Sequence, residues 1–298
     1  MKYIYLDTSS INYIHDNLRD DEKKKWRDMT EKTFGGQMVF SPISLFEILN
    51  SKTERKDDLI HTCQLLFDDN LLPTPTAILD RYVEQGCPTV EKGNLDLKSN
   101  NIFRDVWQDV SSNLNKTVIV HKMTNMNDLS KILKRFIKNT PLDSSEESFE
   151  YEFTIRQCID EFSSLLDVQN TFERVSLFFI VVILLIGGLP FDSPEDFWKK
   201  RNVSSIKCKI CYLTEQCRPL VYRGPIAAMS LMAIHQVENG KSTRGLFNDC
   251  LHVGYAVYCS AILSNDDHFL KLGKEMNKYI KCMFLKIGIE KEFVYKGG

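Results

Sequence analysis

The chain lacks a strong excess of charge, a framework of paired cysteines and any internal repeat. Its 38 basic and 40 acidic residues leave a net charge of −2, so a nucleic-acid partner would need a local basic patch. Nine cysteines, an odd number without regular spacing, argue against a disulfide scaffold and favour a reducing compartment. No basic region followed by an apolar core opens the sequence, so we expect no secretory signal and a cytoplasmic location.

Long hydrophobic runs are also missing. Residues 177–186 are wholly apolar, but Gly187 and Gly188 end the run after ten residues, and Pro190 follows. A membrane-spanning helix needs about 20 apolar residues, so we predict a buried central helix and no membrane contact. The purified protein should therefore stay in solution without detergent. A requirement for detergent would favour the alternative, a membrane span.

Four short acidic signatures, two near each end of the chain, are the most informative feature that is present. The first two are YIYLDTSS at residues 3–10 and MVFSPISLFEI at residues 38–48. The other two are NDCLHVGYA at residues 248–256 and AILSNDDHF at residues 261–269. Each signature places an acid just after an apolar strand or on a predicted helix.

Acids at strand ends have a chemical consequence in an open α/β fold. The carboxyl ends of parallel strands form the edge at which such folds bind ligands. Carboxylates that meet at one edge repel one another unless cations lie among them. Clusters with oxygen ligands alone suit Mg²⁺ or Mn²⁺, so the signatures predict a divalent metal site.

In order and local context, these segments resemble the PIN-domain family of metal-dependent nucleases. Members of that family open with a strand ending in Asp-Thr/Ser and carry a Glu on a later helix. They then show Asp-x-x-His-x-x-x-Ala on a helix and close with a strand running into Thr/Ser-x-Asp. The matching residues here are Asp7, Glu47, Asp249 with His252 and Ala256, and Ser264 with Asp266. The resemblance covers residues 1 to about 85 and about 240 to 298.

The chemistry of phosphodiester hydrolysis assigns a role to each acid. Two divalent cations about 4 Å apart can activate a water and neutralise charge on the phosphate and leaving oxygen. Asp7, at a strand end, is the expected bridging ligand, and Asp249 and Asp266 would complete the ligand set. Glu47 would hold a metal directly or through water. Asp267 is adjacent to Asp266 and could replace it.

Other polar residues near the acids have weaker roles. Thr8 and Ser264 are expected to orient metal-bound waters, and Arg244 lies close enough to Asp249 in sequence to contact substrate. His252 could act as a base or ligand, although a packed histidine is the commoner state and the one we expect. The basic tracts at residues 199–201, 207 and 209, and 241–244 could contact phosphates, but apart from Arg244 we expect them to be solvated faces.

A second candidate metal site involves three cysteines. Cys208, Cys211 and Cys217 form part of a zinc pattern. A structural zinc site needs four ligands, and no fourth lies at a recognised spacing. We expect reduced thiols, with zinc as the alternative.

The predicted fold class is α/β, a three-layer α/β/α PIN-like domain with a central parallel sheet. Residues 1–87 and 236–298 are expected to form it, around a mostly helical insertion at 88–235. The insertion would supply substrate selection, self-association or a surface for a protein partner. Strands are expected at residues 2–6, 38–40, 71–73, 261–263 and 282–287. Helices are expected at residues 8–17, 20–32, 41–51, 57–67, 129–137 and 151–166, the first capped by Thr8, Ser9 or Ser10.

The resemblance implies a Mg²⁺- or Mn²⁺-dependent endoribonuclease whose partner is its RNA substrate. Two alternatives remain open. One is a structure-specific DNA nuclease, and the other is a catalytically inactive PIN-like scaffold or binding module. The chain keeps all four acids, which favours catalysis over an inactive module.

Overall fold

The computed structural model describes residues 2–51, 55–85, 107–108, 110, 112, 126–186 and 218–289. The chain forms two compact units. The first consists of Met1–Thr74, Gly93–His121 and Tyr255–Gly298, and the second of Pro75–Lys92 and Lys122–Gly254. The segment that carries Asp249 therefore belongs to the second unit, although the sequence led us to expect it in the sheet domain.

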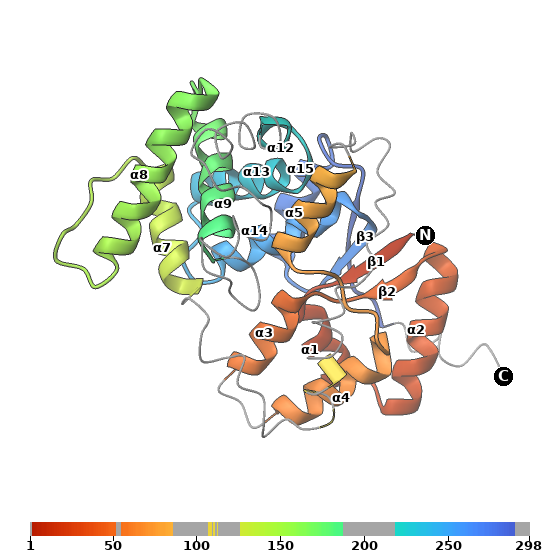
Figure 1. Ribbon diagram of the computed structural model, residues 1–298. Coiled ribbons are helices and arrows are strands. Elements are labelled where there is room, and N and C mark those ends of the chain that lie inside the picture. Colours follow the sequence, from red (N-terminus) through yellow and green to blue (C-terminus); the bar gives the residue numbers. More distant parts are fainter. Residues whose placement is uncertain are drawn as a thin grey trace. The chain divides into compact units, whose positions relative to one another are not determined.

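The first unit is built on a four-stranded, all-parallel sheet with strand order β2-β1-β3-β4 (Figure 1). The predicted α/β fold with a central parallel sheet is confirmed. The strands are β1 (Tyr3–Leu6), β2 (Gln37–Val39), β3 (Cys259–Ser264) and β4 (Met283–Lys286). The strand predicted at residues 71–73 is wrong, because only an isolated bridge between Phe40 and Leu71 forms there. Pro73 has no N–H to donate, which stops the pairing from continuing.

The strand order reverses between β1 and β3. From β1 the chain crosses to β2 on one side, whereas β3 continues to β4 on the other side. Such a switch point leaves a crevice at the carboxyl ends of the two inner strands, where open α/β sheets bind ligands. Asp7 directly follows β1, and Asn265 and Asp266 directly follow β3, so these residues lie at that edge.

Helices cover both faces of the sheet. A Cβ at Gly273 of α15 (Asp267–Met276) would clash with the Phe284 ring, so β4 and α15 pack closely there. The next residue of β4, Leu285, instead lines a cavity whose other side contains Trp26 of α2 (Asp20–Phe34). Successive strand residues point to opposite faces, so α2 and α15 form the two outer layers. The helices of this unit are α1 (Thr8–Asn17), α2 (Asp20–Phe34), α3 (Pro42–Asn50), α4 (Lys56–Phe67) and α15 (Asp267–Met276).

Local sequence signals fix the ends of two of these helices. Ser41 caps α3 by accepting a hydrogen bond from the Ser44 N–H at 3.2 Å, as the Ser-Pro pair predicts. Gly35 ends α2 in the left-handed conformation, with φ of 60°. Although α2 is rich in charged residues, it also has a buried side, where Trp26 is only 4% exposed.

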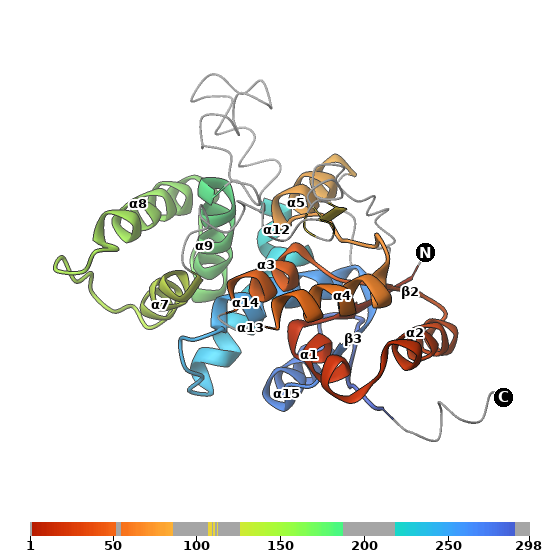
Figure 2. The same ribbon diagram turned by 90° about the horizontal axis from the view of Figure 1, so that it is seen from below.

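The described part of the second unit is helical. Its helices are α5 (Pro75–Glu84), α7 (Met126–Ile137), α8 (Phe149–Leu166), α9 (Thr171–Ile186), α12 (Arg218–Tyr222), α13 (Gly224–Glu238) and α14 (Leu246–Gly254). Helices α7, α8 and α9 lie side by side (Figure 2). Every residue of 175–183 in α9 is at most 5% exposed, which confirms the predicted buried central helix. No helix among the described residues is long and apolar enough to cross a membrane.

A buried ion-pair network joins α7 to α8 in this unit. Glu152 of α8 is 1% exposed and contacts the Arg135 guanidinium of α7. Its other carboxylate oxygen accepts hydrogen bonds from Arg156 Nε at 3.1 Å and Nη2 at 2.9 Å. Arg135 also pairs with the exposed Glu146 at 2.6 Å. Because one buried carboxylate pairs with two partly buried guanidinium groups, its removal would deprive both of them of their buried acceptor.

Candidate functional site

Asp7 lies at the centre of the switch-point edge and is 6% exposed. Its Oδ1 accepts the Ser10 N–H at 2.9 Å, so Asp7 caps α1, and the predicted caps at the following hydroxyls were wrong. A carboxylate one position before the helix reaches that amide directly. Ser9 Oγ lies 2.9 Å from both carboxylate oxygens, and Ser264 Oγ donates to Oδ2 at 2.6 Å.

Serine hydroxyls join the start of α1 to the end of β3 and the residues that follow it. Ser264 Oγ, besides donating to Asp7, accepts the Asp266 N–H at 3.1 Å. Ser9 Oγ accepts the Asn265 N–H at 3.0 Å and lies 3.2 Å from Ser264 Oγ. Residues 257 positions apart in the sequence, Asp7 and Ser264, are therefore in direct contact.

Glu47 is connected to the same edge through Thr8. The Thr8 hydroxyl donates to Glu47 Oε2, and Glu47 is half-buried on α3. Two residues before Asp7, the Tyr5 hydroxyl lies 2.7 Å from Oγ of Ser41, the residue that caps α3. Burial raises the pKa of the Tyr5 hydroxyl well above its ordinary value, so the group stays neutral and adds no charge to the site.

The two neighbouring acids after β3 have different surroundings. Asp266 caps α15, where its Oδ1 accepts the N–H groups of His268 at 2.8 Å and Phe269 at 3.0 Å. Asp267 is exposed, and its two oxygens lie 2.8 and 3.0 Å from Lys286 Nζ. The structure therefore favours Asp266 over Asp267 as the acid available to a ligand.

Asp249 lies on α14, in the second unit, and has its own partners there. Its Oδ2 accepts a hydrogen bond from Gln236 Nε2 at 2.9 Å and also contacts Lys241 Nζ. Burial raises the pKa of the Asp249 carboxyl above its ordinary value, and the Lys241 ammonium opposes that rise. His252 is 4% exposed, as expected of a packed histidine, and Arg244 is exposed.

The first unit thus brings most of the predicted site residues together. These residues are Asp7, Thr8, Glu47, Ser264 and Asp266. Their carboxylate and hydroxyl oxygens are the ligand types that Mg²⁺ and Mn²⁺ accept, so the donor set fits in kind. In number it falls short, because no group of three or more His, Cys, Asp or Glu side chains among the described residues is placed to hold a metal ion.

Several contacts of these acids were not predicted from the sequence. From the sequence, Ser9 was expected only as a helix cap. The run of hydroxyl residues after Asp7 is the sequence feature that could have indicated its contact with the carboxylate. Lys241 belongs to a short basic tract, whereas Gln236 and Lys286 have no sequence signal. These contacts form only when neighbouring helices, or segments that are separate in the chain, pack against each other.

Comparison with known proteins gives no match: no family model, curated protein or solved structure matches the chain. The resemblance to PIN domains therefore stays a prediction from the four sequence signatures, and the structure itself shows an α/β fold with a four-stranded parallel sheet. Cys208, Cys211 and Cys217, considered for zinc, lie outside the described residues, and so do the basic residues 199–201, 207 and 209.

Proposed function

We propose that the protein is a metal-dependent endoribonuclease with a PIN-like fold, acting at the edge of the sheet between β1 and β3. The observation that carries the proposal is the position of Asp7. This carboxylate lies at the switch point of a parallel sheet, is almost fully buried and contacts the last residue of the other inner strand, Ser264. Burial strengthens its attraction for a cation, because solvent screening is weak there.

Asp7, Glu47 and Asp266 are the residues of the first unit that would hold Mg²⁺ or Mn²⁺. When bound, the cation would activate a water and neutralise charge on the scissile phosphate. Asp249 as a further ligand, and Arg244 as a phosphate contact, stay predictions from the sequence.

The hydroxyl groups supply the rest of the local chemistry. In the structure, Ser264 donates to Asp7 and Thr8 donates to Glu47, so both carboxylates are stabilised by O–H donors. A hydroxyl can rotate and present its lone pairs instead. Once the negative charge is balanced by a cation, the same two groups can therefore accept hydrogen bonds from an attacking water and orient it.

Cleavage of mixed RNA and single-stranded DNA, with Mn²⁺ or with a chelator, tests the proposal. We expect internal cleavage of RNA with Mn²⁺, none with the chelator, and slower or no cleavage of DNA. Preferential cleavage of DNA would instead support the structure-specific DNA nuclease. Binding of nucleic acid without cleavage of either substrate would support the inactive binding module.

A further inference from the structure

In the second unit, α7 packs beside α14 and the loop that leads into it from α13 (Figure 2). Two hydrogen bonds fix this contact. Lys134 Nζ of α7 donates to the Lys241 carbonyl at 3.0 Å, and Ser130 Oγ, one turn earlier on α7, accepts the Phe247 N–H at 3.0 Å. The chain from 241 to 247 is therefore held against α7 at both ends, and Arg244 lies between these two contacts.

This loop has a defined conformation. Gly240 and Gly245 bracket it, with φ values of 73° and 78° that other residues rarely adopt. Between them, the Thr243 carbonyl accepts the Leu246 N–H at 3.3 Å. The exposed Arg244 is thus presented by a short turn whose two ends are fixed on the helices.

Three cations at this junction have no acidic partner among the described residues. We call Lys134, Lys138 and Arg244 the basic face. Lys138 follows Lys134 by one turn, about 6 Å along the axis, and its N–H donates to the Lys134 carbonyl at 3.1 Å. The neighbouring cations differ, because Lys131 pairs with Asp128 at 3.4 Å and Lys241 contacts Asp249. The basic face therefore carries positive charge that no side chain of the described structure neutralises.

The basic face offers charge without an apolar anchor. The large exposed hydrophobic side chains in the part of the chain that the structure describes are Phe153, Leu165, Tyr222, Tyr279 and Met283. None of them lies on α7 or on the loop between α13 and α14. Protein interfaces have an apolar, often aromatic core and are depleted in lysine, whereas a phosphate backbone is bound mainly by cations. The composition of the face matches a nucleic-acid backbone better than an acidic protein.

The basic face also borders one of the predicted site acids. Asp249 is on α14, and its N–H donates to the carbonyl of Gly245, the residue after Arg244. The carboxylate of Asp249 contacts Lys241, whose carbonyl accepts the hydrogen bond from Lys134. A polyanion on the basic face would therefore pass close to this acid.

We propose that Lys134, Lys138 and Arg244 bind the phosphate backbone of single-stranded RNA beside Asp249. The inference rests on the proposed function, which supplies the choice of RNA as the polyanion. Contacts to phosphates position a nucleic acid without reading its bases. RNAs of the same length and different sequence are therefore bound alike by this face.

Removal of two charges from the basic face tests this inference. The variant combines Lys138→Gln with Arg244→Gln, and the matched control combines Lys24→Gln with Lys25→Gln on α2. All four positions are exposed, so both proteins should fold, which circular dichroism checks. The control loses the same net charge from a different surface.

The probe is a fluorescently labelled single-stranded RNA dodecamer in the presence of a chelator, with anisotropy measured over a range of salt concentrations. For single strands, the logarithm of the affinity falls with the logarithm of salt by about 0.7 per phosphate contact. We expect the Lys138/Arg244 variant to lower this slope by about 1.4, which weakens binding about 25-fold at about 0.1 M salt. The control should keep the slope of the wild type.

An equal slope in the two double variants, or no binding of RNA by the wild type, would overturn the inference. Displacement of the RNA by poly-glutamate at an equal concentration of charge would also overturn it and indicate an acidic protein as the partner. A reduced slope in the Lys138/Arg244 variant, with no cleavage by the wild type in Mn²⁺, would uphold the basic face and reject the nuclease. Cleavage by the wild type, with an unchanged slope in that variant, would reject the basic face and keep the nuclease.

Discussion

Asp7→Asn is expected to abolish cleavage of RNA by a protein that remains folded. The substitution keeps the shape of the side chain but removes the charge and the proposed bridging ligand. Asn caps a helix about as well as Asp, and its Oδ1 can still accept the Ser10 N–H. Ser9 and Ser264 must rotate to accept from the new amide group, at a cost of about 1 kcal/mol each. We therefore expect the free energy of unfolding to fall by no more than about 2 kcal/mol.

The same variant should lose its response to Mn²⁺. A cation that binds only the folded protein stabilises the wild type by about 2.7 kcal/mol at 100 times its Kd, which raises the melting temperature. Thermal unfolding with and without Mn²⁺ measures this shift. Asp57→Asn, an exposed acid on α4 of the same unit, is the control and should behave like the wild type. Surviving cleavage, or an unfolded variant, would mean that Asp7 is only a structural cap.

Glu152→Gln is expected to cause the largest loss of stability in the second unit. It removes the buried charge that faces Arg135 and Arg156 while keeping the size of the side chain. Breaking one partner of a buried ion pair costs about 3–5 kcal/mol, because the remaining charge stays buried without compensation. Both guanidinium groups are partly exposed, at 18% for Arg135 and 19% for Arg156, and Arg135 retains its contact with Glu146, so we expect no more than the lower end of that range.

Urea unfolding followed by circular dichroism measures the effect. Glu150→Gln is the matched control, since Glu150 is an exposed acid in the first turn of the same helix. The control should change the free energy of unfolding by less than about 0.5 kcal/mol. If both variants lost the same amount, the network around Glu152 would contribute nothing beyond an ordinary surface charge.

The parts of the fold that were predicted carry strong local signals. β1 and β3 are apolar runs that end in polar residues, and Ser41-Pro42 marks the start of α3. The apolar run at 177–186 could be read as a buried helix because it is too short for a membrane span. In each case a few adjacent residues decide the local structure.

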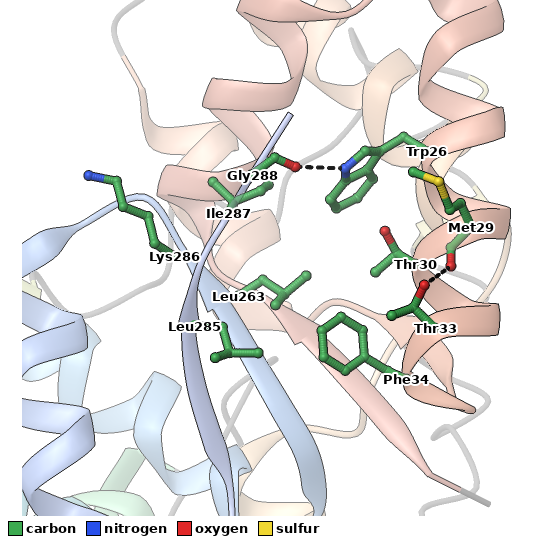
Figure 3. Close-up of a pocket in the computed structure, with 10 residues that line it drawn as sticks. All are labelled: Trp26, Met29, Thr30, Thr33, Phe34, Leu263, Leu285, Lys286, Ile287 and Gly288. Carbon is green, nitrogen blue, oxygen red and sulfur yellow. Dashed lines mark hydrogen bonds between the residues drawn. The ribbon is translucent and has the colours of Figure 1, made fainter. Parts of the chain in front are cut away.

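What the sequence did not reveal depends on distant contacts. The segment at residues 71–73 looks like a strand in the sequence. In the structure it pairs only through a single bridge to Phe40, and Pro73 prevents further pairing because it has no N–H. The buried side of α2 around Trp26 is hidden among charged residues, and the strands that complete the cavity beside it lie more than 230 positions later (Figure 3). Which unit contains Asp249 likewise depends on how α14 packs against α13 and α7, not on the motif that carries it.

The long sequence separation between Asp7 and Ser264 has a consequence for the protein during its synthesis on the ribosome. β1 is among the first segments to be synthesised, but β3, which pairs with it on the side away from β2, follows 257 positions later. At about 5–20 residues per second, translation leaves that side of β1 unpaired for about 13–50 s. An open edge of this kind can pair with other chains, so protection on the ribosome would benefit this protein. A chain that stops before β3 carries Asp7, Glu47 and Asp249 but has neither Ser264 nor Asp266, so incomplete products cannot assemble the acidic edge.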